Sequence, residues 1–132
     1  KLTHAQHIGI GVTLEVSDGV LVKPTIDTIQ LVRLLGILLD NGIEAAQESQ
    51  TPSLSIAVFK QDGDEVFIIR NTYSASVSKE QLLKNTLSTK GPERGIGLQN
   101  VAAIVKLENN VFLETQITDH YYTQLITIHQ EE

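Results

Sequence analysis

Apolar residues alternate with other residues near the start of the chain. From Ile8 to Val16, every second residue is apolar, which is the period of a strand with one buried face. Asp18 and Gly19 then predict a turn before the short apolar run at residues 20–22. We therefore expect a strand from about residue 8, followed by a turn.

The next stretch has the signals of a long helix. Asp27 stands three residues ahead of Gln30, an arrangement in which each side chain satisfies an unpaired backbone donor at a helix start. We expect a helix of roughly 20 residues that begins at about Thr28 and ends before Pro52. Its apolar positions recur at helical spacing and predict the buried face: Leu31, Leu34, Leu35, Leu38 and Leu39.

The second half of the chain predicts two pairs of strands around a loop and a helix. Segments 54–60 and 65–71 read as a hairpin whose turn, Asp62 and Gly63, supplies positive φ angles. About 20 residues without a sustained period follow, which predicts a functional lid over about residues 72–94. Helical spacing returns at residues 98–105, and we expect two last strands near 111–117 and 121–129.

This order of elements predicts the fold class. The chain reads strand, helix, two strands, lid, helix, two strands. Such an order fits an α+β fold, a two-layer α/β sandwich with a mixed, mostly antiparallel sheet and helices on one face. No repeat, low-complexity tract or linker divides residues 1–132, so we expect a single domain.

Composition and charge narrow the class of protein. With 41% hydrophobic and 20% charged residues and no long apolar run, the chain resembles a soluble globular protein that does not enter a membrane. The absence of cysteine excludes disulfides and thiolate metal sites and favours the cytoplasm. A net charge of -6 without clustered Lys and Arg argues against nucleic-acid binding. Because the chain begins with Lys1, we expect a fragment of a longer protein.

A glycine cluster lies where the expected lid gives way to the second helix. Gly91, Gly95 and Gly97 would let backbone N–H groups approach a phosphate, whose charge the helix dipole favours. The alternative is that these glycines merely turn the chain into the helix. The cluster matches neither a Walker A loop nor a dinucleotide fingerprint.

Polar residues interrupt the apolar first helix. Asn41 and Glu44 are three residues apart and share a helical face, with Asp40 at its edge. An amide oxygen is a hard ligand that suits Mg²⁺, so Asn41 could hold a metal that bridges phosphates. The alternative is that all three residues form the solvated stripe of an amphipathic helix.

Taken together, these motifs resemble a known family. LLGILLDNGIEAA (34–46) resembles the N box of the GHKL superfamily, which has the Bergerat ATP-binding fold of gyrase, a class of heat-shock chaperones, histidine kinases and mismatch-repair ATPases. STKGPERGIGLQNV (88–101) is similar to its second glycine box, and FIIRNTY (67–73) stands in place of the first. Within the superfamily the motifs resemble histidine kinases of the peptide-pheromone (quorum-sensing) receptor group, the competence and accessory-gene-regulator type.

The resemblance implies ATP and Mg²⁺ as cofactors and a role for each matching residue. Asn41 would be the catalytic amide that ligates Mg²⁺ between the triphosphate oxygens, and Asn71 would accept a hydrogen bond from the adenine amino group. The remaining cofactor-binding residues would cradle the phosphates or balance their charge: Lys90, Arg94, Gly95, Gly97 and Leu98.

Three positions depart from the superfamily pattern. Ile37 stands where hydrolysing members carry the glutamate that activates water, and isoleucine cannot take a proton. Gly42 replaces the usual alanine, at a cost in helix stability of roughly 1 kcal/mol. The full first glycine box is missing, and Asn71 replaces its aspartate, as is usual in the pheromone-receptor group.

A histidine kinase also needs a phosphoacceptor histidine. His4 and His7 lie at the entrance to the first expected strand, and His120 and His129 lie in or beside the last hairpin, so none has the helical setting of an acceptor. We expect solvent-facing or packing roles for all four. The resemblance implies that the acceptor and the dimerisation helices lie upstream of Lys1.

The sequence therefore predicts the catalytic domain of a histidine kinase that donates the γ-phosphate of Mg-ATP to a histidine outside this chain. By itself the fragment would transfer nothing. The implied partners are its own dimerisation domain and a response regulator, within a homodimeric, membrane-bound kinase whose catalytic domain is cytoplasmic. The alternatives are a GHKL serine kinase of the anti-sigma type and a nucleotide-free interaction module with the same fold.

Overall fold

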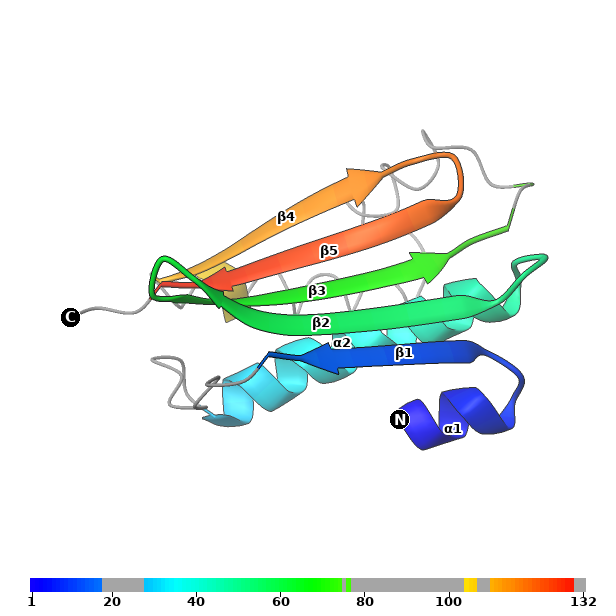
Figure 1. Cartoon of the computed structure of the whole chain (residues 1–132), viewed down its shortest axis with the longest axis horizontal. Helices are drawn as coiled ribbons and strands as arrows, with labels where there is room; N and C mark the ends of the chain where they lie inside the picture. Colours follow the sequence, from blue (N-terminus) through cyan, green and yellow to red (C-terminus); the bar gives the residue numbers. More distant parts are fainter. Residues whose placement is uncertain (18–27, 75, 77–103, 107–109, 130–132) are drawn as a thin grey trace.

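The computed structural model describes residues 1–17, 28–74, 76, 104–106 and 110–129 (Figure 1). Five strands form one mixed sheet in the order β1-β2-β3-β5-β4. β1 pairs with β2 in parallel, and the other neighbours pair antiparallel. The strands are β1 (Gly11–Val16), β2 (Ser53–Gln61), β3 (Asp64–Thr72), β4 (Val111–Ile117) and β5 (Tyr121–Ile128).

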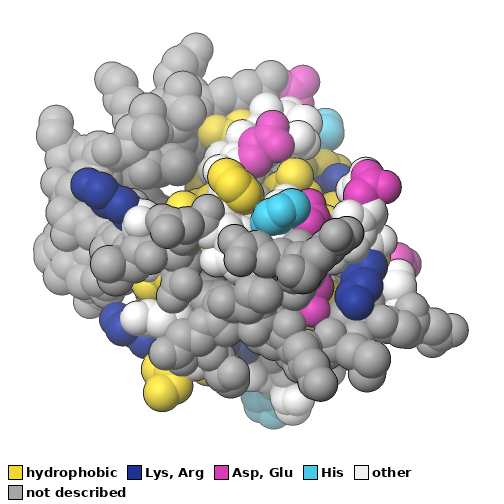
Figure 2. Space-filling model, turned by 90° about the vertical axis from the view of Figure 1, so that its left-hand side faces the viewer, with side chains coloured by type: hydrophobic (Ala, Val, Ile, Leu, Met, Phe, Trp, Pro, Cys, Tyr) yellow, Lys and Arg dark blue, Asp and Glu magenta, His cyan; other side chains and the backbone are white. Residues whose placement is uncertain are grey.

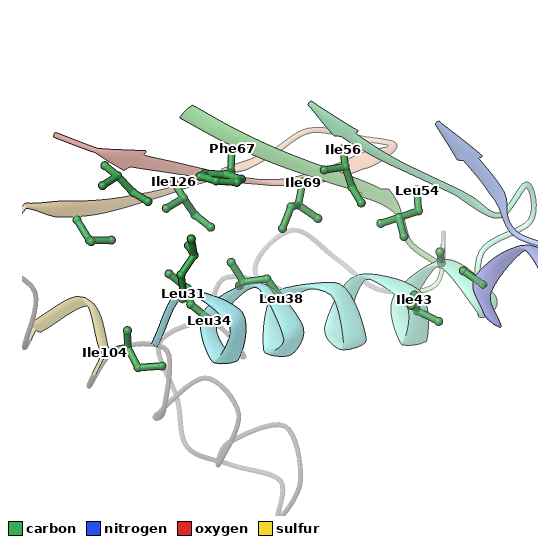
Figure 3. Packing of buried hydrophobic residues seen from close by; sticks show 14 of the residues in the cluster. Leu31, Leu34, Leu38, Ile43, Leu54, Ile56, Phe67, Ile69, Ile104 and Ile126 are labelled. Atoms are coloured by element: carbon green, nitrogen blue, oxygen red, sulfur yellow. The ribbon is translucent and has the colours of Figure 1, made fainter. Parts of the chain in front are cut away.

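Helix α2 (Thr28–Gln47) covers one face of this sheet, which we call the inner face. It connects the parallel strands β1 and β2, because parallel neighbours need a crossover that returns the chain to the same end of the sheet. The buried leucines Leu31, Leu34 and Leu38 of α2 point at the inner face. Opposite them lie Phe67, Ile69 and Ile126 of the central strands (Figure 3). The predicted α+β class, mixed sheet and long helix are thereby confirmed.

The β2–β3 hairpin forms as predicted. Asp62 has a φ of 54° and Gly63 a φ of 86°, the left-handed pair that the right-handed twist of a two-residue hairpin requires. The last two strands also form within the predicted ranges, with the turn at residues 118–120 between them.

The N-terminus differs from the prediction. Residues Leu2–His7 form a short helix, α1, and the strand begins at Gly11 instead of at about residue 8. Gly9, with a φ of 92°, turns the chain after the helix. Ala5 is fully buried against the core, so packing stabilises a helix that is too short to form alone. His4 and His7 therefore lie in a six-residue helix, and the predicted position at the entrance to a strand is wrong.

Some predictions fall outside the described residues. These are the turn at Asp18 and Gly19, the capping residue Asp27, nearly all of the lid at about 72–94 and most of the second helix. Of that helix, the structure describes residues 104–106, which are helical, and Ile104 is buried in the core. Among the helices described, none has the length and apolar character needed to span a bilayer.

Candidate functional site

Asn41 lies in the last two turns of α2 and is partly buried. The residue after it, Gly42, is buried and faces the sheet. Leu38 and Ile43, which belong to the core, hold this part of the helix on the inner face. The rigid packing of its neighbours therefore positions the Asn41 side chain at the border between the core and solvent.

Asn71 lies near the end of β3 and is only 3% exposed. Its neighbour across the antiparallel ladder is Leu54, so both side chains lie on the inner face that α2 covers. The Asn71 Nδ2 donates a hydrogen bond of 2.9 Å to the carbonyl oxygen of Thr72. A carbonyl only accepts, which fixes the amide orientation: one Nδ2 hydrogen is donated to the backbone, and Oδ1 remains as an acceptor.

Gly42 brings α2 into direct contact with Asn71. A Cβ atom at Gly42 would lie 3.3 Å from Asn71 Oδ1 and 3.2 Å from Leu54 Cδ1, tighter than ordinary van der Waals contact. The structure thus brings together two elements about 30 residues apart in sequence, which carry the predicted site residues Asn41 and Asn71.

The strand end that carries Asn71 is anchored on two sides. The Thr72 hydroxyl lies 2.8 Å from Ser49 Oγ, beyond the end of α2, and accepts a hydrogen bond of 3.0 Å from the Ser53 amide. On the other side, the Tyr73 hydroxyl donates to the carbonyl of Thr118 in the β4–β5 turn. The residues that lead into the expected lid are thus tied to α2, β2 and the last hairpin.

Asp40 and Ile37, two further residues of α2, differ in exposure and in what they contact. The Asp40 carboxylate accepts a hydrogen bond of 2.8 Å from Lys1 Nζ, with side chains that are 61% and 47% exposed. A pair this exposed contributes little to stability because water and salt screen it. Ile37 is partly buried and packs against the core, whereas Glu44 is exposed.

Other predicted residues lie apart from this site or outside the described range. All four histidines are exposed, and His129 Nδ1 lies 2.8 Å from Asp64 Oδ1 at the opposite end of the sheet. Figure 2 views that end and shows acidic and histidine side chains at the surface.

The predicted phosphate-binding residues are outside the described residues: Lys90, Arg94, Gly95, Gly97 and Leu98.

Sequence reasoning missed a polar row on the inner face beside Asn71. Tyr122 is opposite Asn71 in the β3–β5 ladder, and its hydroxyl accepts a hydrogen bond of 2.7 Å from Gln124 Nε2. The Thr115 hydroxyl in turn donates to Gln124 Oε1 over 2.7 Å. One signal was available: strand alternation places Gln124 on the same face as Ile126, so a buried amide interrupts an apolar row.

A buried carboxyl lies at the other end of the inner face. Glu65 is 1% exposed, and its Oε2 has no hydrogen-bond partner. Burial raises the pKa of Glu65 above its ordinary value, and the positive charge of Lys60 offsets part of that rise. Since Glu65 lies at the start of β3 and Asn71 near its end, this carboxyl is not part of the site around Asn71.

The metal implied by the sequence can be tested against the residues present. Within the described ranges no three His, Cys, Asp or Glu side chains come together in a group that could hold a metal ion. A metal bound at Asn41 would therefore take most of its other ligands from water and substrate oxygens. Mg²⁺ is bound in this way at phosphate-transfer sites, so the residues present fit it.

Comparisons with known proteins assign the family. The model of the GHKL domain family matches residues 26–129, so the chain belongs to that family. No curated protein matches the sequence.

Solved histidine kinase structures share the fold. The catalytic domain of histidine kinase ThkA has a TM-score of 0.76 at 17% identity, with 96% of this chain and 84% of that chain covered. The Acinetobacter baumannii histidine kinase AdeS gives 0.68 at 17% identity, with 96% and 57% covered. Full-length ShkA, solved in complex with AMPPNP, gives 0.65 at 18% identity, with 96% and 27% covered. The chain thus spans just over half of AdeS, and it has the fold of histidine kinase catalytic domains.

Proposed function

We propose that this chain is the ATP-binding catalytic domain of a sensor histidine kinase. The observation that carries the proposal is the close approach of α2, at Gly42 next to Asn41, to Asn71 of β3, within a GHKL fold. This approach brings the element that carries Asn41, whose amide oxygen could bind a metal ion, close to Asn71, whose buried amide oxygen could accept a hydrogen bond from a nucleotide base. The ShkA structure, which holds AMPPNP, supports a nucleotide as the ligand of such a fold.

Asn71 would recognise adenine. Its Oδ1 is an acceptor, while its Nδ2 is already bonded to Thr72. Adenine carries an exocyclic amino group that donates to such an acceptor. Because Asn71 is only 3% exposed, a hydrogen bond from a ligand would replace little water and would be well defined in direction.

Asn41 would bind Mg²⁺ through its amide oxygen. When bound, Mg²⁺ would neutralise part of the phosphate charge of the nucleotide. Lys90 and Arg94 would balance further phosphate charge, and the backbone of Gly95, Gly97 and Leu98 would donate N–H groups to the phosphates. This chain thus binds and orients the nucleotide, which is the main contribution of protein groups in phosphoryl transfer.

The phosphoryl acceptor is a histidine of another domain. Ile37 packs against the core and has no group that could activate water, which favours transfer to a side chain over hydrolysis. The γ-phosphoryl group would bond to a ring nitrogen of that histidine, and ADP would leave. The acceptor domain, the homodimer it forms, the response regulator and the membrane anchor belong to the longer protein. The catalytic domain itself would face the cytoplasm.

The peptide-pheromone (quorum-sensing) receptor group is the specific class we propose. It rests on LLGILLDNGIEA and on Asn71 in place of the family aspartate. The sequence upstream of Lys1 tests it: a histidine-containing helix preceded by membrane spans supports the receptor kinase, and a chain with neither contradicts it.

Autophosphorylation of the full-length kinase tests the role of Asn41. Asn41→Asp and Asn41→Ala should abolish labelling from Mg-ATP, because the first alters the charge and geometry of the metal ligand and the second removes it. Asp40→Asn is the matched control, since it changes the adjacent side chain, which is exposed and paired with Lys1, and should keep labelling. Normal labelling of both Asn41 variants contradicts the metal assignment.

A further inference from the structure

Two elements expose apolar side chains at the same end of the molecule. Of the six large hydrophobic side chains that the described residues leave exposed, four belong to the end of β1 or the start of α2: Leu14, Val16, Ile29 and Val32. Each of the four is more than half exposed. We call these four side chains the apolar strip. Such a patch on a protein surface marks a place that another segment or molecule covers.

The β1 part of the strip belongs to the inner face of the sheet. Leu14 is paired with Ile56 of β2. Ile56 points to the inner face (Figure 3), and directly paired residues share a face, so Leu14 points there as well. Val16, two residues further along β1, lies on the same face. β1 ends where α2 begins (Figure 1), so both parts of the strip lie at this end of the sheet.

The α2 part of the strip leads toward the start of α1. Ile29 and Val32 share a row of the helix surface with Gly36 and Asp40, because residues three and four apart are neighbours on a helix. Lys1 Nζ donates to Asp40 Oδ1 over 2.8 Å, and a Cβ atom at Gly36 would lie 3.5 Å from the Lys1 side chain. Helix α1 therefore begins on the same row, about one turn of α2 beyond Val32.

The N-terminal end of α1 points at the strip. From its first residues the helix runs to His7, and the chain then enters β1 at Gly11, the end of that strand opposite Val16. In Figure 1 the N-terminus lies below the middle of β1, and α1 runs from there toward the start of the strand. A helix that continued α1 upstream would therefore run back along β1 toward the strip.

Helix α1 also lacks the signals of a helix start. No side chain caps its N-terminus, and its first turn holds no acidic residue. Its six residues are too few to form a stable helix alone. Leu2 and Ala5, which are three residues apart, pack against the core and give the helix one apolar side. These are the properties expected of the last turns of a longer helix.

We propose that the segment directly upstream of Lys1 in the longer protein continues α1 as an amphipathic helix and covers the apolar strip. Gly36 and Ile29 are about 10 Å apart along the axis of α2, so about two further turns of α1 span the strip. The apolar residues of this segment continue the helical spacing of Leu2 and Ala5. A separate partner would have to share this surface with the chain that enters at Lys1.

The inference rests on the proposed function, in which this domain belongs to a longer kinase. The acceptor domain of that kinase lies upstream, so the same helix attaches the acceptor domain to the catalytic domain. The strip is then the surface of the catalytic domain that fixes the direction of this attachment.

Thiol labelling tests whether the strip is covered. The chain has no cysteine, so a single introduced thiol reports its own exposure. Leu14→Cys and Val32→Cys are each made in this chain and in the same chain extended upstream by its natural residues over about three turns of helix, with any cysteine there replaced by serine. A maleimide should label both thiols about tenfold more slowly in the extended chain.

Phe112→Cys is the matched control. Phe112 is as exposed as the strip residues but lies on β4, the edge strand opposite β1. Its thiol should be labelled at the same rate in both forms.

Thermal unfolding gives a second readout that needs no thiol. Val32→Ser should lower the Tm of the extended chain by about 3 °C more than the Tm of this chain, because the side chain is buried only in the extended form. Phe112→Ser should lower both Tm values equally.

The outcomes decide between the upstream helix and other occupants. Slower labelling of both thiols in the extended chain, independent of protein concentration, supports the inference. Equal labelling rates in the two forms would overturn it, as would protection that grows with protein concentration, which indicates a second copy of the chain. An upstream sequence without apolar residues at helical spacing would overturn it as well. Calorimetric binding of ATP is measured separately on both forms, so the proposed function can fail while the strip is covered, or hold while it is not.

Discussion

Thr72 is the residue whose loss should most clearly loosen the strand end beside Asn71. Thr72→Val replaces the hydroxyl by a methyl group of similar shape and so leaves no cavity. It removes the acceptor of the Ser53 amide, at 3.0 Å, and the partner of Ser49 Oγ, at 2.8 Å. Each such hydrogen bond contributes about 1 kcal/mol net, so the variant should be less stable by about 2 kcal/mol.

Urea and thermal unfolding measure this loss. For a chain of 132 residues, about 2 kcal/mol corresponds to a fall in Tm of about 7 °C. Thr127→Val is the matched control, because Thr127 also lies inside a strand and its hydroxyl has no hydrogen bond within the described residues. Thr127→Val should change stability by less than about 0.5 kcal/mol. If Thr72→Val is no less stable than Thr127→Val, the anchoring described here is wrong.

Three further changes test the packing, the buried carboxyl and the surface pair. Leu34→Ala, at a fully buried position, should cost about 3 to 5 kcal/mol in urea unfolding, and a cost below about 1 kcal/mol would contradict the core described here. Burial raises the pKa of Glu65, so the folded state binds this proton more tightly than the unfolded chain, and destabilisation grows as pH rises from 4.5 through the raised pKa. Glu65→Gln should therefore be more stable than the wild type at neutral pH and equal to it below about pH 4.5, and a difference that is independent of pH would refute this account. Asp40→Asn, which breaks an exposed pair with Lys1, should change the free energy of unfolding by less than about 1 kcal/mol and leave the Kd for ATP unchanged.

Local patterns were sufficient to predict the central elements of the fold. The leucine spacing of α2 depends only on the helical period, and the β2–β3 turn depends on the φ angles that Asp62 and Gly63 tolerate. Helix α1 was not predictable in this way. Its six residues are too few to be stable alone, and the burial of Ala5 against distant parts of the chain decides their conformation.

The candidate site, too, could be predicted only in part from the sequence. The types and order of Asn41 and Asn71 were visible in the sequence, because they belong to motifs. Their proximity was not, since it depends on the register between β2 and β3 and on how closely α2 approaches them. Gly42 illustrates the limit: by sequence it was a weak helix position, and only the structure shows that it lies against Leu54 and Asn71.

Titration calorimetry of the chain with ATP, with and without Mg²⁺, tests the central claim most directly. We predict binding of one nucleotide per chain, tighter with Mg²⁺ than without it, and loss of the Mg²⁺-dependent part in Asn41→Ala. Thermal stabilisation by the same nucleotide should follow from the measured Kd by mass action. No heat and no stabilisation at millimolar nucleotide would contradict the proposed function and favour an interaction module that keeps the GHKL fold without binding nucleotide.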